Sequence, residues 1–147
     1  MRTTSSNRPT PHAMAARIIA EAPDEKWIRD LVDHLDRRVR TAPLERLLTL
    51  WRLSAAEAAK VFGVSRQAFT KWRKSGPPAD RAPAVAAMAA ATDLLDRYVK
   101  RERIPAVVRR AAEQLGGLSL YEMACSGRHS DVRDAAAAMF DLRRVQP

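Results

Sequence analysis

The stretch Leu53–Gly76 contains the signals for two short helices joined by a tight turn, and no other feature limits the possible folds as strongly. Ser54 and Glu57 have the spacing of a capping box, in which the serine oxygen accepts a hydrogen bond from a free N–H group and the glutamate bonds back. The first helix is therefore expected over about 55–61. Gly63 follows it and can adopt the left-handed conformation that ends a helix.

The second helix of this stretch is expected to begin at Ser65, whose hydroxyl can cap its first turn. Phe69 and Trp72 are three residues apart, so both should face the first helix. Ala58 and Ala59 in the first helix are small enough to let the two helices cross closely. Two short helices that cross in this way form a helix-turn-helix.

The opposite face of the second helix is polar and basic, which suits contact with double-stranded DNA. Arg66 has the donor geometry to pair with guanine, and Gln67 has the geometry to pair with adenine. Thr70 can touch a thymine methyl group or a phosphate, and the basic residues that follow are expected to meet phosphates. Any surface helix of a basic protein exposes similar residues. The predicted DNA-binding residues are Ser65, Arg66, Gln67, Thr70, Lys71, Arg73 and Lys74.

The positive charge of the chain is concentrated in the middle of the sequence. The formal net charge is +9, and residues 43–81 hold eight basic and three acidic residues. Residues 24–40 are balanced, whereas residues 96–110 hold six basic and two acidic residues. A basic centre favours contact with a polyanion, although a solvated surface without a partner has the same composition. The run Arg97–Arg110 is either a second phosphate contact or such a solvated face.

The rest of the chain also has the helical spacing of apolar residues, and the predicted fold class is all-α, a helical bundle with a central helix-turn-helix. Asp24 is expected to cap a helix that runs to about Arg40, and Pro43 is expected to separate it from a helix that ends near residue 53. No stretch has the alternation that is typical of a strand. Further helices are expected over about 80–100, 105–114, 119–126 and 131–144. Ser119 and Glu122 form a second capping box for the helix over 119–126, and Ser130 is expected to cap the last helix.

Composition and breaks divide the sequence into three expected parts. Residues 1–22 are rich in Ser, Thr, Pro and Arg and are expected to form a flexible arm, partly helical near residues 14–20. Residues 23–80 form the helix-turn-helix domain with its preceding helix. Residues 81–147 form a C-terminal helical region that binds a partner or makes a dimer.

Several classes of protein do not fit this sequence. Cys125 is the only cysteine, so the fold needs no disulfide and suits a reducing cytosol. No apolar run reaches the length of about 18 residues that spans a membrane, and we expect a cytoplasmic protein. No phosphate-binding loop, metalloprotease motif or cysteine pair occurs, and His12, His34 and His129 lie far apart. We therefore expect no enzyme activity, no catalytic residue, no metal site and no cofactor.

The helix-turn-helix stretch resembles the Xre/Cro family of repressors. In that family the helix that begins near Ser65 lies in the major groove, which implies the same role for the basic face described above. Phe69 stands where the family usually has a β-branched residue, which implies a bulkier core at this point. The residues that support the resemblance are Ala59, Gly63, Val64, Ser65, Phe69, Trp72, Arg73, Gly76 and Pro77.

The stretch Ile104–Phe140 resembles the toxin-binding region of antitoxins of the Xre/MbcA/ParS type. That family often has a Trp-Leu pair in place of Val107 and Val108, and proline in place of Ala111 and Leu120. The two resemblances together cover about residues 44–140. The matching residues are Val107, Val108, Arg109, Leu115, Gly116, Gly117, Ser119, Glu122, Met123, Gly127 and Val132.

This second resemblance implies a function as the DNA-binding antitoxin of a type II toxin–antitoxin system. The implied partner is a RES-type toxin that consumes NAD, whose active-site cleft the C-terminal region would cover. The complex would bind its own promoter and repress the operon. The implied partner-binding residues are Val107, Val108, Arg109, Leu115, Gly116, Gly117, Ser119, Glu122 and Met123.

Two other functions fit the same sequence. The chain can be an Xre/Cro-like repressor without a toxin, or a helical adaptor that no longer binds DNA. Residues 104–144 can equally form a dimerisation surface or complete the core. A homodimer is expected in any DNA-binding case, because helix-turn-helix proteins commonly bind paired half-sites.

Overall fold

The computed structural model describes residues 8–141, and over that range the chain is helical, as predicted. An isolated antiparallel bridge between Ala112 and Leu118 is the only extended pairing among these residues. The predicted all-α fold class is therefore confirmed. The first part of the expected arm, and the expected end of the last helix at residue 144, lie outside the described residues.

The chain divides into two units, Met1–Asp36 and Arg37–Pro147. The described part of the first unit contains helix α1, Pro11–Glu21, and the beginning of helix α2, Glu25–Trp51. The Thr10 hydroxyl accepts a hydrogen bond from the Ala13 N–H at 3.1 Å and so caps α1. The helix expected near residues 14–20 is present and longer than expected, because Thr10 and Pro11 start a regular helix that runs from residue 11 to residue 21.

Helix α2 continues through Pro43, so the predicted break at this residue is wrong. Asp24 accepts a hydrogen bond from the Trp27 N–H at 2.8 Å, which confirms the predicted cap. Proline inside a helix removes one backbone hydrogen bond and crowds the preceding turn. The turns beyond Pro43 compensate for this cost, because Leu44 and Trp51 are fully buried in the second unit.

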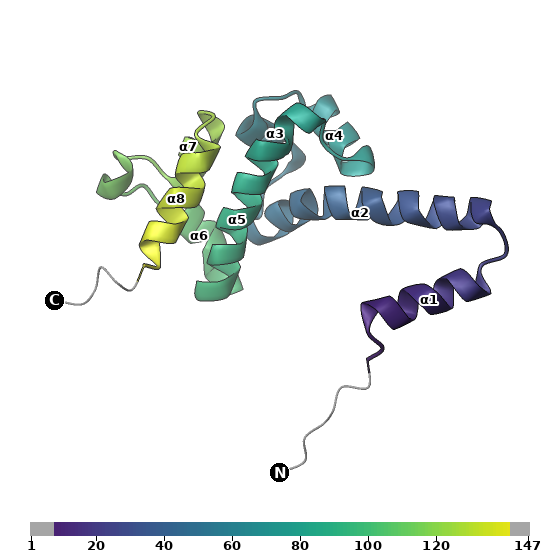
Figure 1. Cartoon of the computed structure of the whole chain (residues 1–147). Helices are drawn as coiled ribbons and strands as arrows, with labels where there is room; N and C mark the ends of the chain where they lie inside the picture. The colour runs from purple at the N-terminus through teal and green to yellow at the C-terminus, as the bar shows by residue number, and fades with distance from the viewer. Residues whose placement is uncertain (1–7, 142–147) are drawn as a thin grey trace, which may run out of the picture. The chain divides into compact units, whose positions relative to one another are not determined.

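The second unit contains the remaining helices (Figure 1). The capping boxes predicted at Ser54 and Ser119 are both present. The last helix begins at His129 rather than after a Ser130 cap, with Arg128 in the capping position. These helices are α3, Ala55–Phe62; α4, Arg66–Ser75; η1, Ala79–Arg81; α5, Ala82–Tyr98; η2, Arg101–Arg103; α6, Ile104–Arg109; η3, Glu113–Leu115; α7, Leu120–Cys125; and α8, His129–Met139.

One hydrophobic core runs through this unit from Leu44 to Ala136. The Trp51 indole N–H donates to the Thr92 hydroxyl at 3.1 Å, and that hydroxyl donates to the Met88 carbonyl at 2.7 Å. A buried indole needs such an acceptor, so this chain of bonds fixes α2 against α5. The domain boundary expected at residue 80 falls inside this single core.

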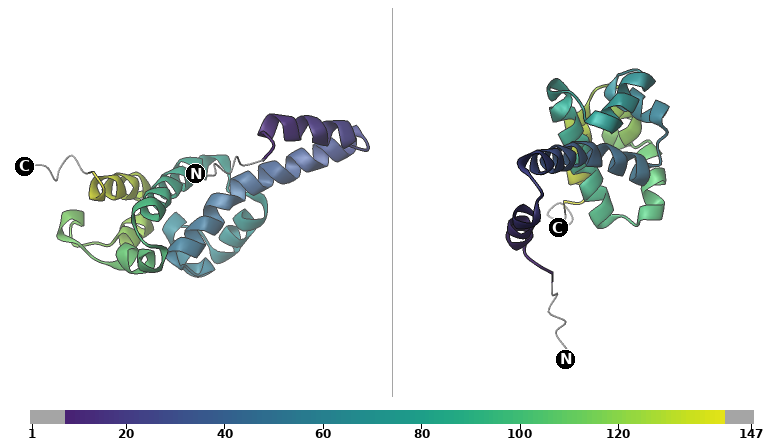
Figure 2. Two further views of the ribbon diagram at one scale, coloured as in Figure 1. Left: turned by 90° about the horizontal axis from the view of Figure 1, so that it is seen from below. Right: turned by 90° about the vertical axis from the view of Figure 1, so that its right-hand side faces the viewer.

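Helices α5 and α8 lie side by side and run in the same direction (Figure 1), and the left view of Figure 2 shows the same pair. Their C-terminal ends meet where the rings of Tyr98 and Phe140 stack at 4.9 Å. Helix α7 packs against both α3 and α8. The C-terminal helices therefore support the helix-turn-helix directly and do not form a separate body.

Candidate nucleic-acid interface

The aromatic residues of α4 hold this helix against α3, as predicted. Phe69 is 0% exposed and Trp72 is 7% exposed. Their rings lie 6.2 Å and 5.8 Å from the ring of Phe62 at the end of α3. Because residues three apart point in similar directions, burial of this pair turns the opposite side of α4 outward.

The outward face of α4 is polar and solvent-exposed. The Ser65 hydroxyl accepts from the Ala68 N–H at 3.1 Å and caps the helix, and the Thr70 hydroxyl donates to the Arg66 carbonyl at 2.9 Å. These two hydroxyl groups are thus used within α4. Four of the predicted DNA-binding side chains are exposed and form no hydrogen bond or ion pair within residues 8–141: Arg66, Gln67, Lys71 and Lys74.

Arg73 differs from its basic neighbours because it is held by α2. Its Nε and Nη2 atoms donate to the two carboxylate oxygens of Glu45 at 2.6 Å and 3.0 Å. The hydrogen bonds to Glu45 raise the pKa of Arg73. This bidentate pair, which the sequence analysis missed, ties α4 to α2 and gives Arg73 a structural role beside any contact with phosphate.

The turn between α3 and α4 is fixed by side chains from distant parts of the chain. Gly63 has a φ of 63°, which is the left-handed conformation expected for the end of α3. Arg81 Nη1 donates to the Phe62 carbonyl at 3.0 Å, and His129 Nε2 donates to the Val61 carbonyl at 2.6 Å. The imidazole also stacks on the Phe62 ring at 5.8 Å. Arg81 and His129 thereby bond the last carbonyl groups of α3, and no local sequence signal indicated this.

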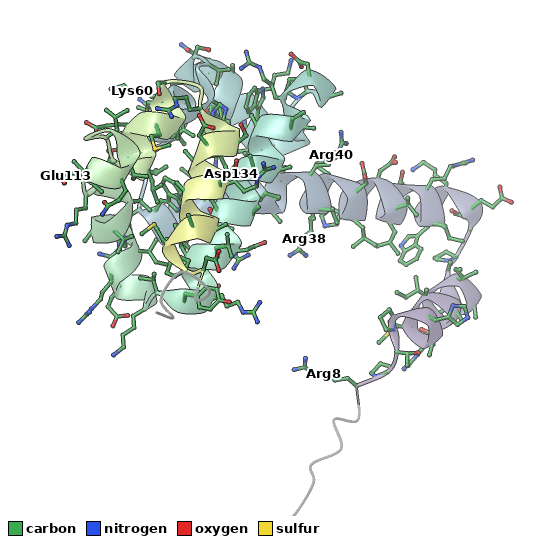
Figure 3. The ribbon with its side chains drawn as sticks, turned by 60° about the vertical axis from the view of Figure 1, so that its left-hand side comes forward. Arg8, Arg38, Arg40, Lys60, Glu113 and Asp134 are labelled. Atoms are coloured by element: carbon green, nitrogen blue, oxygen red, sulfur yellow. The ribbon has the colours of Figure 1, made fainter. Side chains whose placement is uncertain are left out.

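The C-terminal end of α4 lies against α2 at Gly76. This glycine has a φ of 91°, and a side-chain carbon placed on it would lie 3.1 Å from the Arg40 Cβ atom. Arg40 and Arg38 project from opposite sides of α2, as Figure 3 shows. The close contact at Gly76 therefore places basic residue Arg40 beside the end of the candidate recognition helix.

The residues expected to bind a protein partner separate into two groups. Val108, Ser119 and Met123 are buried in the second unit, so the prediction that they form a partner surface is wrong for this fold. Their side chains complete the core or cap α7, because α6 and α7 turn their apolar faces towards α3 and each other. The residues that remain accessible are Val107, Arg109, Leu115, Gly116, Gly117 and Glu122.

An open cavity of about 950 Å³ lies between the α6–η3 segment and α8. Val107 and Leu115 line it together with Arg110, Ala135 and Met139. The neighbouring Gly116 and Gly117 both have positive φ, at 69° and 80°, as a tight turn requires. The accessible apolar residues of the expected partner surface are thus brought together at one cavity.

The basic run Arg97–Arg110 is partly neutralised within the chain. Arg101 donates to both carboxylate oxygens of Asp96 at 2.7 Å and 3.1 Å. Arg46 of α2 pairs with the same carboxylate and with Asp93. The hydrogen bonds from Arg101 and Arg46 lower the pKa of Asp96. These ion pairs favour the interpretation of this region as a solvated face with internal pairing.

No described helix combines the length and the apolar character that a membrane span requires. Within residues 8–141, no three His, Cys, Asp or Glu side chains are grouped closely enough to hold a metal ion. Comparison of this chain with models of protein families, with curated proteins and with solved structures finds no match.

Proposed function

We propose that this chain is a sequence-specific double-stranded DNA-binding protein that reads the major groove with α4. The observation that supports this most strongly is the division of α4 into a buried aromatic side and an exposed basic side. Four outward side chains are left without partners in the described chain, at the positions that a recognition helix uses for base and phosphate contacts. Positive net charge over residues 43–81 supports the same function.

In this proposal Arg66 and Gln67, at the N-terminal end of α4, contact base edges. Lys71 and Lys74 contact phosphates, which add affinity without sequence preference. The α2 contacts of Arg73 and Gly76 fix the angle at which α4 leaves the protein surface. Because α4 is held by α2, α3 and the aromatic core, it can enter the groove without folding on binding.

The proposal is tested by selecting duplexes from a random DNA pool with the full chain and measuring affinity by fluorescence anisotropy. Gln67→Ala should reduce the preference for the selected duplex over random DNA by about 1–3 kcal/mol. The matched control is Gln114→Ala, which removes an exposed glutamine from η3 and should leave both affinities unchanged. Absence of salt-dependent binding to any duplex would refute DNA binding and favour the adaptor function.

The antitoxin function is a second candidate, and the cavity beside α6 and η3 favours it. Apolar residues assigned to toxin binding by the resemblance, Val107 and Leu115, line this cavity and remain accessible. The proposed partner is a RES-type toxin whose active-site cleft the α6–α7 region would cover, and the complex would repress its own promoter. A repressor without a toxin would have the same α4 face but no partner at this cavity.

Co-expression with the neighbouring reading frame tests this second candidate. We expect growth arrest and loss of NAD when the neighbour is expressed alone, and relief by the wild-type chain. Leu115→Asp should abolish relief, while Ala86→Asp, which places the same charge at an exposed position of α5 outside this cavity, should preserve it. Deleting all residues after Lys100 would not test toxin binding alone. The deletion would also remove Ile104 and Val108 from the core that supports the helix-turn-helix.

A further inference from the structure

The end of α3 is held by a helix that lies outside the helix-turn-helix. The Val64 N–H donates to the Ala59 carbonyl at 3.0 Å, which is a local bond of the turn. The Val61 carbonyl instead accepts a hydrogen bond from His129 Nε2 at 2.6 Å, although the two residues are 68 positions apart. Because His129 is the first residue of α8, this bond connects the start of α8 to the turn before the candidate recognition helix.

The His129 ring also begins a series of aromatic contacts that leads to α4. The imidazole stacks on the Phe62 ring with 5.8 Å between the ring centres and 20° between the planes. The Phe62 side chain is 2% exposed, and its ring lies 6.2 Å from the Phe69 ring and 5.8 Å from the Trp72 ring. Phe69 and Trp72 determine which side of α4 faces outward, so the imidazole lies one ring away from the residues that orient this helix.

We propose that His129 is a positioning residue for DNA recognition, which holds α4 at the angle required to enter the major groove. This inference rests on the proposed function of α4. His129 bonds the end of α3 and packs on Phe62, so it acts on DNA affinity through the turn and not through a contact with DNA. A turn without this bond populates other orientations of α4, and the apparent affinity is reduced to the fraction of molecules that keep the competent one.

Loss of the His129 donor should loosen the turn without unfolding the chain. An open cavity of about 650 Å³ lies beside this contact, and its lining includes Val61, Gly63, Arg81 and His129. Water can reach the Val61 carbonyl from this cavity, so a variant that lacks the donor does not leave a buried acceptor unpaired. Arg81 Nη1 continues to donate to the Phe62 carbonyl at 3.0 Å. The effect of such a variant is therefore expected in DNA affinity more than in helical content.

His129→Phe tests this role, because phenylalanine keeps a ring against Phe62 and removes the N–H donor. Fluorescence anisotropy with the duplex selected by the full wild-type chain should show an affinity that is lower by about 10-fold. The dependence of the affinity on salt should stay the same, since no Lys or Arg is changed. His129→Gln places an amide donor at a similar reach from the backbone and should keep the affinity within about 3-fold of the wild type.

Ser130→Gln is the matched control, because it introduces the same side chain as His129→Gln at the adjacent exposed position of α8. It should leave the affinity and its salt dependence unchanged. Hydrogen exchange at the Val64 N–H follows the turn in the absence of DNA, and it should be about 10-fold faster in His129→Phe and unchanged in His129→Gln. Far-UV circular dichroism checks that each variant keeps its helical content, and His129→Leu is the second donor-free variant if His129→Phe is not folded.

Two results would overturn this inference and leave the proposed function intact. The first is a folded donor-free variant that binds the selected duplex as tightly as the wild type, or whose Val64 N–H exchanges no faster. The second is a His129→Gln variant that loses as much affinity as His129→Phe, because the hydrogen bond would then not be the cause. A wild-type chain that binds no duplex would instead refute the proposed function, and this inference with it.

Discussion

Arg109 Nη2 lies 3.2 Å from Glu57 Oε1 and 3.3 Å from the Arg52 carbonyl oxygen, so one guanidinium group joins α6 to the start of α3. The same group lies 5.2 Å from the centre of the Tyr121 ring. Burial, together with a hydrogen bond to Cys125, raises the pKa of Tyr121 to about 12, so this ring stays neutral over the usual pH range. A residue that the family resemblance implied for partner binding thus also connects the C-terminal helices to the helix-turn-helix.

The Glu57 carboxylate should make folding depend on pH. The hydrogen bond from the Ser54 N–H, and then the charge of Arg109, lower the pKa of Glu57 below its usual value of 4.5. A carboxylate with a lowered pKa in the folded chain stabilises the fold above its unfolded pKa, and this contribution is lost as pH falls through the folded pKa. Urea unfolding of wild type and Glu57→Gln from about pH 7 to about pH 3 should show a smaller acid loss in the variant.

The matched control for this pH series is Glu113→Gln, which removes an exposed carboxylate with no recorded partner in the described chain. It should lose stability with falling pH in parallel with the wild type. An acid loss in Glu57→Gln as steep as in the wild type would contradict the role given to the capping box.

Thr92→Val should destabilise the second unit because it removes the acceptor of a buried indole. Trp51 is fully buried, and its N–H group donates to the Thr92 hydroxyl at 3.1 Å. A buried donor without an acceptor costs about 1–3 kcal/mol. We expect a loss of that size in the free energy of unfolding in urea.

Thr49→Val is the control for Thr92→Val, since the exposed Thr49 hydroxyl donates only to the Glu45 carbonyl of its own helix. Its effect should stay within about 0.5 kcal/mol. Equal effects of the two substitutions would show that the bond between Trp51 and Thr92 does not stabilise the contact of α2 with α5.

Gly76→Ala should cost more stability than Gly117→Ala. Both glycines have positive φ, 91° and 80°, but Gly76 also has a ψ of 158°, which places it in a region that essentially only glycine adopts and where alanine costs about 1–3 kcal/mol. Only Gly76 has a neighbour in the way, the Arg40 Cβ atom at 3.1 Å, whereas the space at Gly117 is open. The difference between the two free energies of unfolding therefore contains the backbone strain at Gly76 together with the close contact with Arg40, and the absence of any difference would argue against both.

The helix-turn-helix could be predicted because its signals are local. Ser54 with Glu57, Gly63 and Ser65 determine helix ends through bonds to residues at most a few positions away, and all of these appear in the structure. The direction of Phe69 followed from helical spacing alone. Such features depend little on the rest of the fold, so a single sequence was sufficient to predict them.

Other features depend on residues that are distant in sequence. Nothing near Arg73 indicates that Glu45 would hold it, and nothing near His129 indicates the Val61 carbonyl as its acceptor. The continuation of α2 through Pro43 likewise needs the core that anchors the turns beyond it. Val108, which the family resemblance placed on a partner surface, is inside because α6 packs on α7.

Arg73→Ala and Lys74→Ala should differ although the residues are adjacent. Arg73 is paired with Glu45, so its loss should lower the free energy of unfolding by about 0.2–1 kcal/mol. Lys74 is exposed and has no recorded partner among the described residues, so Lys74→Ala should leave stability nearly unchanged. On DNA, Lys74→Ala should weaken binding to all duplexes alike and reduce the salt slope by about 1.

Anisotropy titrations at several salt concentrations, with urea unfolding of the same samples, measure both effects. Gln67→Ala serves as the comparison, because it should change sequence preference without changing the salt slope. If Lys74→Ala altered the preference for the selected duplex as strongly as Gln67→Ala, the division of α4 into base contacts and phosphate contacts would be wrong. That result would leave the packing of the buried side of α4 unchanged, but the contacts made by its exposed side would have to be assigned again.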